Sequence, residues 1–356
     1  MTGFGKRLIF GFVGCDPEDE EARRLRSCLR DELIGGVILF GHNIRDPRQV
    51  HELIQSFYEV SSDAINKPLI AVDQEGGCVQ RLNSGNGFHD FPSAQQMAAR
   101  YTPQQAFEKY TEMAKDIRAA GFNVNFAPVV DLNHEKPSGQ PCPVIGALGR
   151  SYGADVPQVV EYAHAFVRAH RQQGILTCLK HYPGHGFAAK DSHKGLVDIT
   201  QTHRPMEEQP FKELVKNGDA DMVMVAHLVN RQEDADYPAS LSPKTLKDLR
   251  TYYEGITVSD DLHMGAIIQH FSLEEVLQQT LLAEIDLLIF SNNPKASGGK
   301  TVFQESFTLV EKIHRIVENL FQTGTVSGHF FHASCQRLKK LKEKLAVVMH
   351  PVNDQN

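Results

Sequence analysis

Three histidines, an aspartate and several lysines lie within sixteen residues, in the segment KHYPGHGFAAKDSHKG from Lys180 to Gly195. Three glycines and a proline interrupt this segment, so the sequence excludes a regular helix here. Such a concentration of titratable groups on a loop has three explanations. The loop could bind a metal ion, transfer protons, or be polar without a chemical role.

The explanation by metal binding rests on His181 and His185. On a helix, a spacing of four residues would place both imidazoles on one side of an ion. Pro183 and Gly184 lie between them, so the helical argument fails. A site built from His and carboxylate side chains of several loops stays open as an alternative, but the sequence predicts no metal.

Proton transfer is the chemistry that Asp191 and His193 favour. Asp191 precedes His193 by two residues, close enough in a tight loop for the carboxylate to hold the imidazole ring. Such a pair fixes the tautomer and makes the ring more basic, so His193 could exchange a proton near neutral pH. The alternative is a surface histidine beside a turn aspartate. Asp260, in TVSDDLHM, could serve as a nucleophile, and Asp261 would then face other partners.

Eight short apolar runs, alternating with helical patterns, supply the elements that must position these residues. The alternation predicts an α/β fold, a single (β/α)8 barrel of the TIM type with C-terminal helices. A doubly wound open sheet is less favoured because no glycine-rich phosphate loop follows the first run. The runs are RLIFGFV from Arg7, GGVILF from Gly35, PLIAVD from Pro68, NVNFAPVVD from Asn123, ILTCLKH from Ile175, MVMVAHL from Met222, GITVSD from Gly255 and DLLIFS from Asp286.

Polar residues stand where six of these runs end. In a barrel of this kind the loops at the carboxyl ends of the strands build the active site. A single aspartate at a strand end is more often a helix cap than a catalytic group, so the prediction rests on convergence at one face. The residues are Asp73, Glu75, Asp131, Lys180, His181, His227, Asp260, Asp261 and 291–293.

Helix boundaries are marked by capping residues and prolines. Four pairs place a capping side chain before a proline, and Ser272 begins a capping-box sequence. The tail from about residue 303 to 348 predicts two helices packed on the barrel. Because no linker divides the chain, residues 1–356 are predicted to form one domain. The four pairs are Asp16-Pro17, Asp46-Pro47, Thr102-Pro103 and Ser242-Pro243.

Composition limits the partners of the chain. A formal net charge of −7 argues against binding to nucleic acid, because no basic excess can neutralise phosphates. The apolar run from Leu8 to Gly14 is too short to span a bilayer and has no cleavage signal, so neither a membrane segment nor a signal peptide is predicted. The six cysteines are far apart, as is typical of reduced thiols, and a cytoplasmic location is therefore expected.

Several motifs together resemble one family. They are GGVILFGHNI, AVDQEGGCVQRL, FNVNFAPVVDLN, GRSYG, KHYPGHG with DSH, VMVAHL and TVSDDLHM, in that order. The sequence resembles the single-domain β-N-acetylglucosaminidases of glycoside hydrolase family 3, which recycle cell-wall muropeptides in bacteria. The resemblance implies a (β/α)8 barrel, a small carbohydrate substrate and no cofactor. We further expect a monomer or weak oligomer.

The resemblance also implies roles for individual residues. Asp260 matches the catalytic nucleophile, His193 the general acid/base and Asp191 the partner of that histidine. A further set matches residues that hold the hydroxyl groups of the terminal sugar. This set is Asp73, Arg81, Arg150, Lys180 and His181.

Two positions depart from the family pattern. Cys78 stands where arginine is usual, and Glu284 stands where glycine is usual. Two alternatives to the implied mechanism stay open. One is substrate assistance, in which Asp260 and Asp261 orient the acetamido group of the sugar as nucleophile. The other is a barrel that binds sugar without catalysis.

Overall fold

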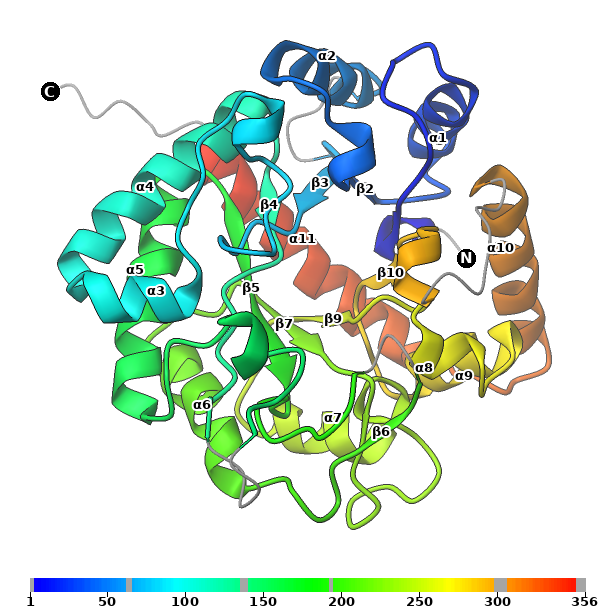
Figure 1. The fold of residues 1–356 in the computed structure, drawn as a ribbon. Helices are drawn as coiled ribbons and strands as arrows, with labels where there is room; N and C mark the ends of the chain where they lie inside the picture. The colour runs from blue at the N-terminus through cyan, green and yellow to red at the C-terminus, as the bar shows by residue number, and fades with distance from the viewer. Residues whose placement is uncertain (1–2, 62–65, 135–139, 192–194, 298–305, 350–356) are drawn as a thin grey trace, which may run out of the picture.

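Eight parallel strands form the centre of the molecule (Figure 1). The computed structural model describes residues 3–61, 66–134, 140–191, 195–297 and 306–349. The order of the strands is β10-β1-β2-β3-β4-β5-β7-β9, and a parallel bridge between Val258 and Leu287 joins the two edges of this sheet. The strands are β1 (Leu8–Phe10), β2 (Gly36–Ile38), β3 (Leu69–Val72), β4 (Val124–Asn125), β5 (Leu176–Tyr182), β7 (Met222–Val225), β9 (Ile256–Ser259) and β10 (Leu288–Phe290).

Each strand coincides with one of the eight predicted runs, and only β5 extends one residue beyond its run, to Tyr182, so the predicted α/β barrel is confirmed. Two further strands, β6 (Val197–Asp198) and β8 (Leu228–Val229), pair with each other outside the barrel. Alternate residues of the barrel strands point inward and fill the interior with apolar side chains. The inward set includes Ile9, Ile38, Leu69, Ala71, Val124, Phe126, Leu176, Met222, Met224, Val258 and Ile289.

Helices surround the barrel, and most predicted helix starts are confirmed. The side chains of Asp46, Thr102, Ser242 and Ser272 each accept a hydrogen bond from a backbone N–H in the first turn of the helix that follows. The helices of the barrel are α1 (Glu20–Arg30), α2 (Pro47–Tyr58), α3 (Ala94–Arg100), α4 (Pro103–Ala120), α5 (Val156–Gln172), α6 (Gln209–Lys216), α7 (Pro243–Arg250), α8 (Gly265–Ile268) and α9 (Leu273–Leu282).

The predicted start at Asp16-Pro17 is wrong, because α1 begins at Glu20 after Asp19. Oδ2 of Asp19 accepts hydrogen bonds from the backbone N–H groups of Cys15 and Asp16, both at 2.8 Å. These bonds fold the preceding residues into a turn. The cap-and-proline pair therefore marks a turn here, and the helix follows it.

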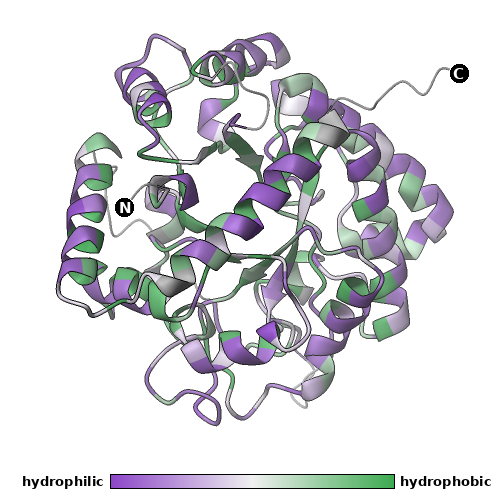
Figure 2. Cartoon of the chain, turned by 180° about the vertical axis from the view of Figure 1, so that it is seen from behind, coloured by the Kyte–Doolittle hydropathy of each residue, from purple (hydrophilic) through white to green (hydrophobic). Residues whose placement is uncertain are grey.

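The two tail helices are α10 (Ser306–Gln322) and α11 (His329–Met349). In Figure 1, α11 lies behind the barrel and crosses it, and Figure 2 shows it from the opposite side, in front of the strands. Leu338, Leu341 and Leu345 of α11 join the apolar cluster of the barrel interior. This helix therefore closes the end of the barrel opposite the carboxyl ends of the strands.

Two ion pairs fix α11 to the barrel. Arg337 binds the buried carboxylate of Asp286 with an Nη2–Oδ1 distance of 2.8 Å, and Lys344 binds the buried carboxylate of Asp221. Both carboxylates are fully buried, and each also binds an arginine of the barrel, Arg250 or Arg171. Because one partner of a buried ion pair cannot be removed without a large cost, α11 is an integral part of the packing.

Glu284, at the position where the resemblance implies glycine, adopts a left-handed backbone conformation with φ of 59°. This conformation costs a residue with a Cβ about 1–2 kcal/mol, but not glycine. The side chain of Glu284 is exposed at the turn after α9. We therefore expect Glu284→Gly to raise the free energy of unfolding by about 1 kcal/mol, measured by urea denaturation. Glu284→Ala is the control, because it removes the carboxylate and keeps the Cβ. An equal gain in both variants would show that charge, not backbone conformation, is responsible.

Candidate active site

A cavity of about 490 Å³ opens at the carboxyl ends of the barrel strands. Its walls come from the loops after β2, β3, β5, β9 and β10 and from the segment between β4 and α5. Seven of the eight predicted site residues line this cavity. The eighth, His193, lies outside the residues that the structure describes. The seven are Asp73, Arg81, Arg150, Lys180, His181, Asp191 and Asp260.

Glu75 is the centre of a buried network of charges on the cavity wall. Its two carboxylate oxygens accept hydrogen bonds from Nε and Nη2 of Arg150, both at 2.8 Å, and Nζ of Lys180 lies 2.6 Å from Oε1. Burial alone would raise the pKa of Glu75, but Arg150 and Lys180 hold it well below its usual range. Glu75 is therefore ionised at neutral pH.

Lys180 also donates a hydrogen bond from Nζ to Oδ1 of Asp73 at 3.0 Å, so it joins two carboxylates. Burial opposes its charge, but Asp73 and Glu75 raise the pKa of Lys180 above its usual value. Nη2 of Arg81 lies 3.7 Å from Oδ2 of Asp73. The side chain of Asp73 is 18% exposed, against 6% for Glu75, so Asp73 is the carboxylate that faces the cavity more openly.

Asp131 holds His181 in place on the same wall. Its Oδ2 lies 2.7 Å from Nδ1 of His181, and its Oδ1 accepts a hydrogen bond from the backbone N–H of His185 at 2.7 Å. With Nδ1 engaged in this way, Nε2 of His181 lies on the side of Arg150, 3.4 Å from Nη2. Burial and the neighbouring His181 lower the pKa of His185 to about 4, so His185 is neutral at pH 7.

Asp260 and Asp261 follow β9 and have different surroundings. Oδ1 of Asp260 accepts a hydrogen bond from the backbone N–H of Asp261 at 2.8 Å. Both oxygens of Asp261 are engaged by Ser291, Oδ1 with its backbone N–H at 2.9 Å and Oδ2 with its hydroxyl at 2.5 Å. Asp261 therefore ties β9 to the end of β10. Asp261 also lines the cavity, so its contacts with Ser291 do not remove it from the site.

Other residues at the strand ends have structural contacts. His227, at the end of the sixth run, lies with Nδ1 2.6 Å from the hydroxyl of Ser240 and Nε2 2.8 Å from the carbonyl oxygen of Asp261. It therefore supports the turn that carries the two aspartates. Cys78, the departure from the family pattern, is exposed, and its thiol donates a weak hydrogen bond to the carbonyl of Leu148 at 3.6 Å.

Sequence reasoning missed the apolar part of the cavity. Phe40 ends the second run, and the guanidinium carbon of Arg81 lies 5.8 Å from the centre of its ring. An apolar residue at the carboxyl end of a barrel strand was the available signal, but it looks the same as a core residue in the sequence. The apolar lining includes Phe40, Val79, Phe126, Leu148, Met224, Met264 and Ile289.

The cavity is lined by a network of carboxylates and cations, and Asp260 lines the same cavity. Fixed carboxylates, a lysine and arginines recognise neutral polyols by many directional hydrogen bonds, and apolar surface packs against the ring faces of a sugar. Among the helices of the described ranges, none is long and apolar enough to cross a membrane.

Comparisons with known proteins agree with this chemistry. Residues 10–341 match the family described as glycosyl hydrolase family 3 N terminal domain. A relative named β-hexosaminidase from Tolumonas auensis is 37% identical, over 80% of this chain and 83% of the relative. Another relative of the same name, from Haemophilus influenzae, is 35% identical, over 80% of this chain and 79% of the relative. The structure of a glycoside hydrolase family 3 β-N-acetylglucosaminidase from Paenibacillus sp. aligns with a TM-score of 0.81 and 29% identity, over 96% of this chain and 62% of that one. The chain therefore belongs to glycosyl hydrolase family 3 and is a glycoside hydrolase of the β-hexosaminidase type.

Proposed function

We propose that the protein is a retaining exo-β-N-acetylglucosaminidase that removes terminal N-acetylglucosamine from muropeptide fragments of the GlcNAc-1,6-anhydroMurNAc type. The observation that carries the proposal is the meeting of Asp260, Asp191 and the Asp73–Lys180–Glu75–Arg150 network in one cavity. The muropeptide preference comes from the family resemblance. A cytoplasmic location and a monomeric or weakly oligomeric state belong to the same proposal.

In the proposed mechanism, Asp73, Arg81, Arg150, Lys180 and His181 hold the hydroxyl groups of the sugar. The carboxylate of Asp260 attacks the anomeric carbon while His193, supported by Asp191, gives a proton to the departing oxygen. The product is a glycosyl ester on Asp260. His193 then takes a proton from water, which attacks the anomeric carbon, breaks the ester and releases the sugar with retained configuration.

The imidazole takes a place that a carboxylic acid fills in the usual retaining scheme, where two carboxyl groups stand about 5–5.5 Å apart. Since a histidine near its unperturbed pKa of about 6.5 can be either acid or base at neutral pH, one residue can serve both steps. If His193 acts first as acid and then as base, Asp191 must hold its imidazole ring in both steps.

The test is hydrolysis of 4-nitrophenyl N-acetyl-β-D-glucosaminide in the presence of a chelator. We expect release of nitrophenol, and proton NMR of the fresh product should show the β-anomer, as double displacement requires. The α-anomer as first product would contradict retention. No turnover of this compound or of the corresponding glucoside would favour the sugar-binding barrel without catalysis.

A fluorinated sugar distinguishes the proposed mechanism from substrate assistance. Fluorine at C5 of an N-acetylglucosaminyl donor slows breakdown of a glycosyl-enzyme and leaves the acetamido group in place, so mass spectrometry should find the adduct on the peptide that contains Asp260. Substrate assistance leaves no such adduct, because the acetamido group of the sugar is then the nucleophile.

A further inference from the structure

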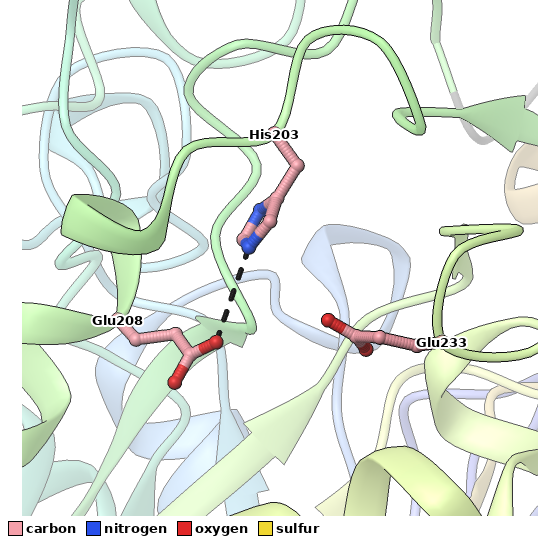
Figure 3. A group of neighbouring side chains, drawn as sticks. All are labelled: His203, Glu208 and Glu233. Carbon is pink, nitrogen blue, oxygen red and sulfur yellow. Dashed lines mark ion pairs between the residues drawn. The ribbon is translucent and has the colours of Figure 1, made fainter.

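A group of three side chains outside the cavity brings a histidine and two glutamates together (Figure 3). His203 lies just before η5 (Pro205–Glu208), which follows β6, and Glu208 is the last residue of η5. Glu233 lies on the loop after β8. One possible ligand atom from each residue lies within 4.8 Å of the other two. None of the three lines the candidate active site.

We propose that His203, Glu208 and Glu233 form a structural site for a divalent transition-metal ion, with Zn²⁺ as its best occupant. Nε2 of His203 lies 3.9 Å from Oε1 of Glu208, too far for a hydrogen bond between them. Two ligands of a tetrahedral zinc ion, each about 2.1 Å from the metal, stand roughly 3.4 Å apart. Shifts of less than about 1 Å would therefore bring the three atoms to bonding distance.

Glu207 supplies the support that a metal-binding histidine needs. Its Oε2 lies 3.2 Å from Nδ1 of His203, an ion-pair contact that does not have the geometry of a hydrogen bond. The carboxylate of Glu207 is buried and also accepts hydrogen bonds from the backbone N–H groups of Phe187 and Arg204, each at 3.2 Å. A carboxylate behind Nδ1 directs the lone pair of Nε2 toward a metal and raises its basicity.

The side chain of His203 is only 9% exposed, so its orientation is fixed by its surroundings. Glu233 is held as well, because Asn230 donates to Oε1 at 3.2 Å and Thr245 donates to Oε2 at 3.3 Å. A partly buried imidazole between two carboxylates suits zinc and similar ions better than Mg²⁺ or Ca²⁺, which prefer oxygen ligands alone.

Lys212 is the cation that competes with a metal for this site. Its Nζ lies 2.9 Å from Oε2 of Glu208, while the other oxygen of that carboxylate is the one nearest His203. The side chain of Lys212 is 40% exposed, so it can move into solvent when an ion binds. Removal of this lysine should therefore strengthen metal binding, whereas removal of a ligand should weaken it.

The proposed site lies between two connections of the barrel, which a bound ion would link. His203 and Glu208 belong to the connection from β5 to α6, and Glu233 belongs to the connection from β7 to α7. These two connections already touch through the pairing of β6 with β8. A bound ion would add a second link between them, and the first connection is also the one that carries Asp191.

The experiment is a zinc titration of the demetallated full chain in a metal-buffered solution, without sugar, so the outcome does not depend on the proposed function. We expect one zinc ion per chain, and an affinity at least about 100-fold weaker in His203→Gln and in Glu233→Gln. Lys212→Gln should bind zinc more tightly. His89→Gln is the matched control, since His89 pairs with Asp116 at 2.9 Å on the surface and is not part of the group of three, and its affinity should equal that of the natural chain.

Thermal unfolding gives a second readout. Zinc at about 100 times its dissociation constant should raise the Tm of the natural chain by a few degrees, but not that of Glu233→Gln. Equal zinc affinity in the natural chain and both ligand variants, or no binding at all, would overturn the site. If His203→Gln fails to fold, Glu233→Gln and Lys212→Gln still decide the matter, because their effects have opposite signs.

Discussion

Replacement of Asp260 by asparagine is expected to lower kcat on 4-nitrophenyl N-acetyl-β-D-glucosaminide by about four orders of magnitude, with little change in KM. The amide oxygen of asparagine can still accept the hydrogen bond from the backbone N–H of Asp261, so the turn after β9 should be preserved. The neutral amide cannot attack the anomeric carbon as a carboxylate does, and the loss therefore falls on the chemical step.

Asp236→Asn is the matched control, since Asp236 is exposed on a loop and does not line the cavity. Its kcat should equal that of the natural chain. Addition of azide to Asp260→Ala tests the role directly, because a small anion that replaces the missing nucleophile attacks from the same face and gives an α-glycosyl azide. Full activity in Asp260→Asn would assign the nucleophile to another group, and a β-configured azide product would contradict direct attack by Asp260.

The second large effect is expected on stability, from Glu75→Gln. This change keeps the shape of the side chain but leaves Lys180 and Arg150 buried without the carboxylate that both contact. Breaking a buried ion pair from one side costs about 3–5 kcal/mol, so the free energy of unfolding in urea at pH 7 should fall by about that amount. Sugar binding should weaken as well, because both cations lose their fixed positions on the cavity wall.

The expected effect depends on pH in a defined direction. The pKa of Glu75 is lowered in the folded protein by Arg150 and Lys180, against the opposing effect of burial. Its stabilisation is therefore complete above the unfolded pKa of about 4.3 and is lost as the pH falls from there toward the folded pKa. The difference between the natural chain and Glu75→Gln should accordingly shrink below about pH 4.

Glu52→Gln is the control for this experiment. Glu52 forms an exposed ion pair with Arg48 on α2, with a distance of 2.7 Å. Such exposed pairs contribute little to stability, so the variant should unfold at almost the same urea concentration as the natural chain. A loss at Glu75 no larger than the loss at Glu52 would mean that water screens the buried network.

The barrel could be predicted because its sequence signals are local. Each of the eight runs is a short apolar stretch with a polar end, and alternation with helices leaves few topologies open. In such a barrel the carboxyl ends of the strands meet at one face. Sequence positions alone therefore predicted that Asp73, Lys180 and Asp260 lie together, and all three line the cavity. The capping pair at Asp46 was equally local, whereas Asp16-Pro17 failed because the side chain of Asp19 bonds back into the turn.

The pairing of charges within the site could not be predicted, because it depends on side-chain directions across different strands. Glu75 stands at a strand end in the sequence just as Asp73 does. Of these two carboxylates, only Glu75 forms ion pairs with both Arg150 and Lys180. The group of His203, Glu208 and Glu233 is a similar case. Their spacing matches no metal-binding motif, and the loops that bring them together are set by the pairing of β6 with β8.

The helix across the far end of the barrel has a consequence for synthesis on the ribosome. Translation produces all eight barrel strands before α11, so a nascent chain ending near residue 320 holds Asp221 and Asp286 without the cations of Lys344 and Arg337. The leucines that seal the interior are also still missing at that stage. The barrel therefore gains its full stability only after release of α11 from the ribosome, and until then its open end is a surface for chaperones to protect.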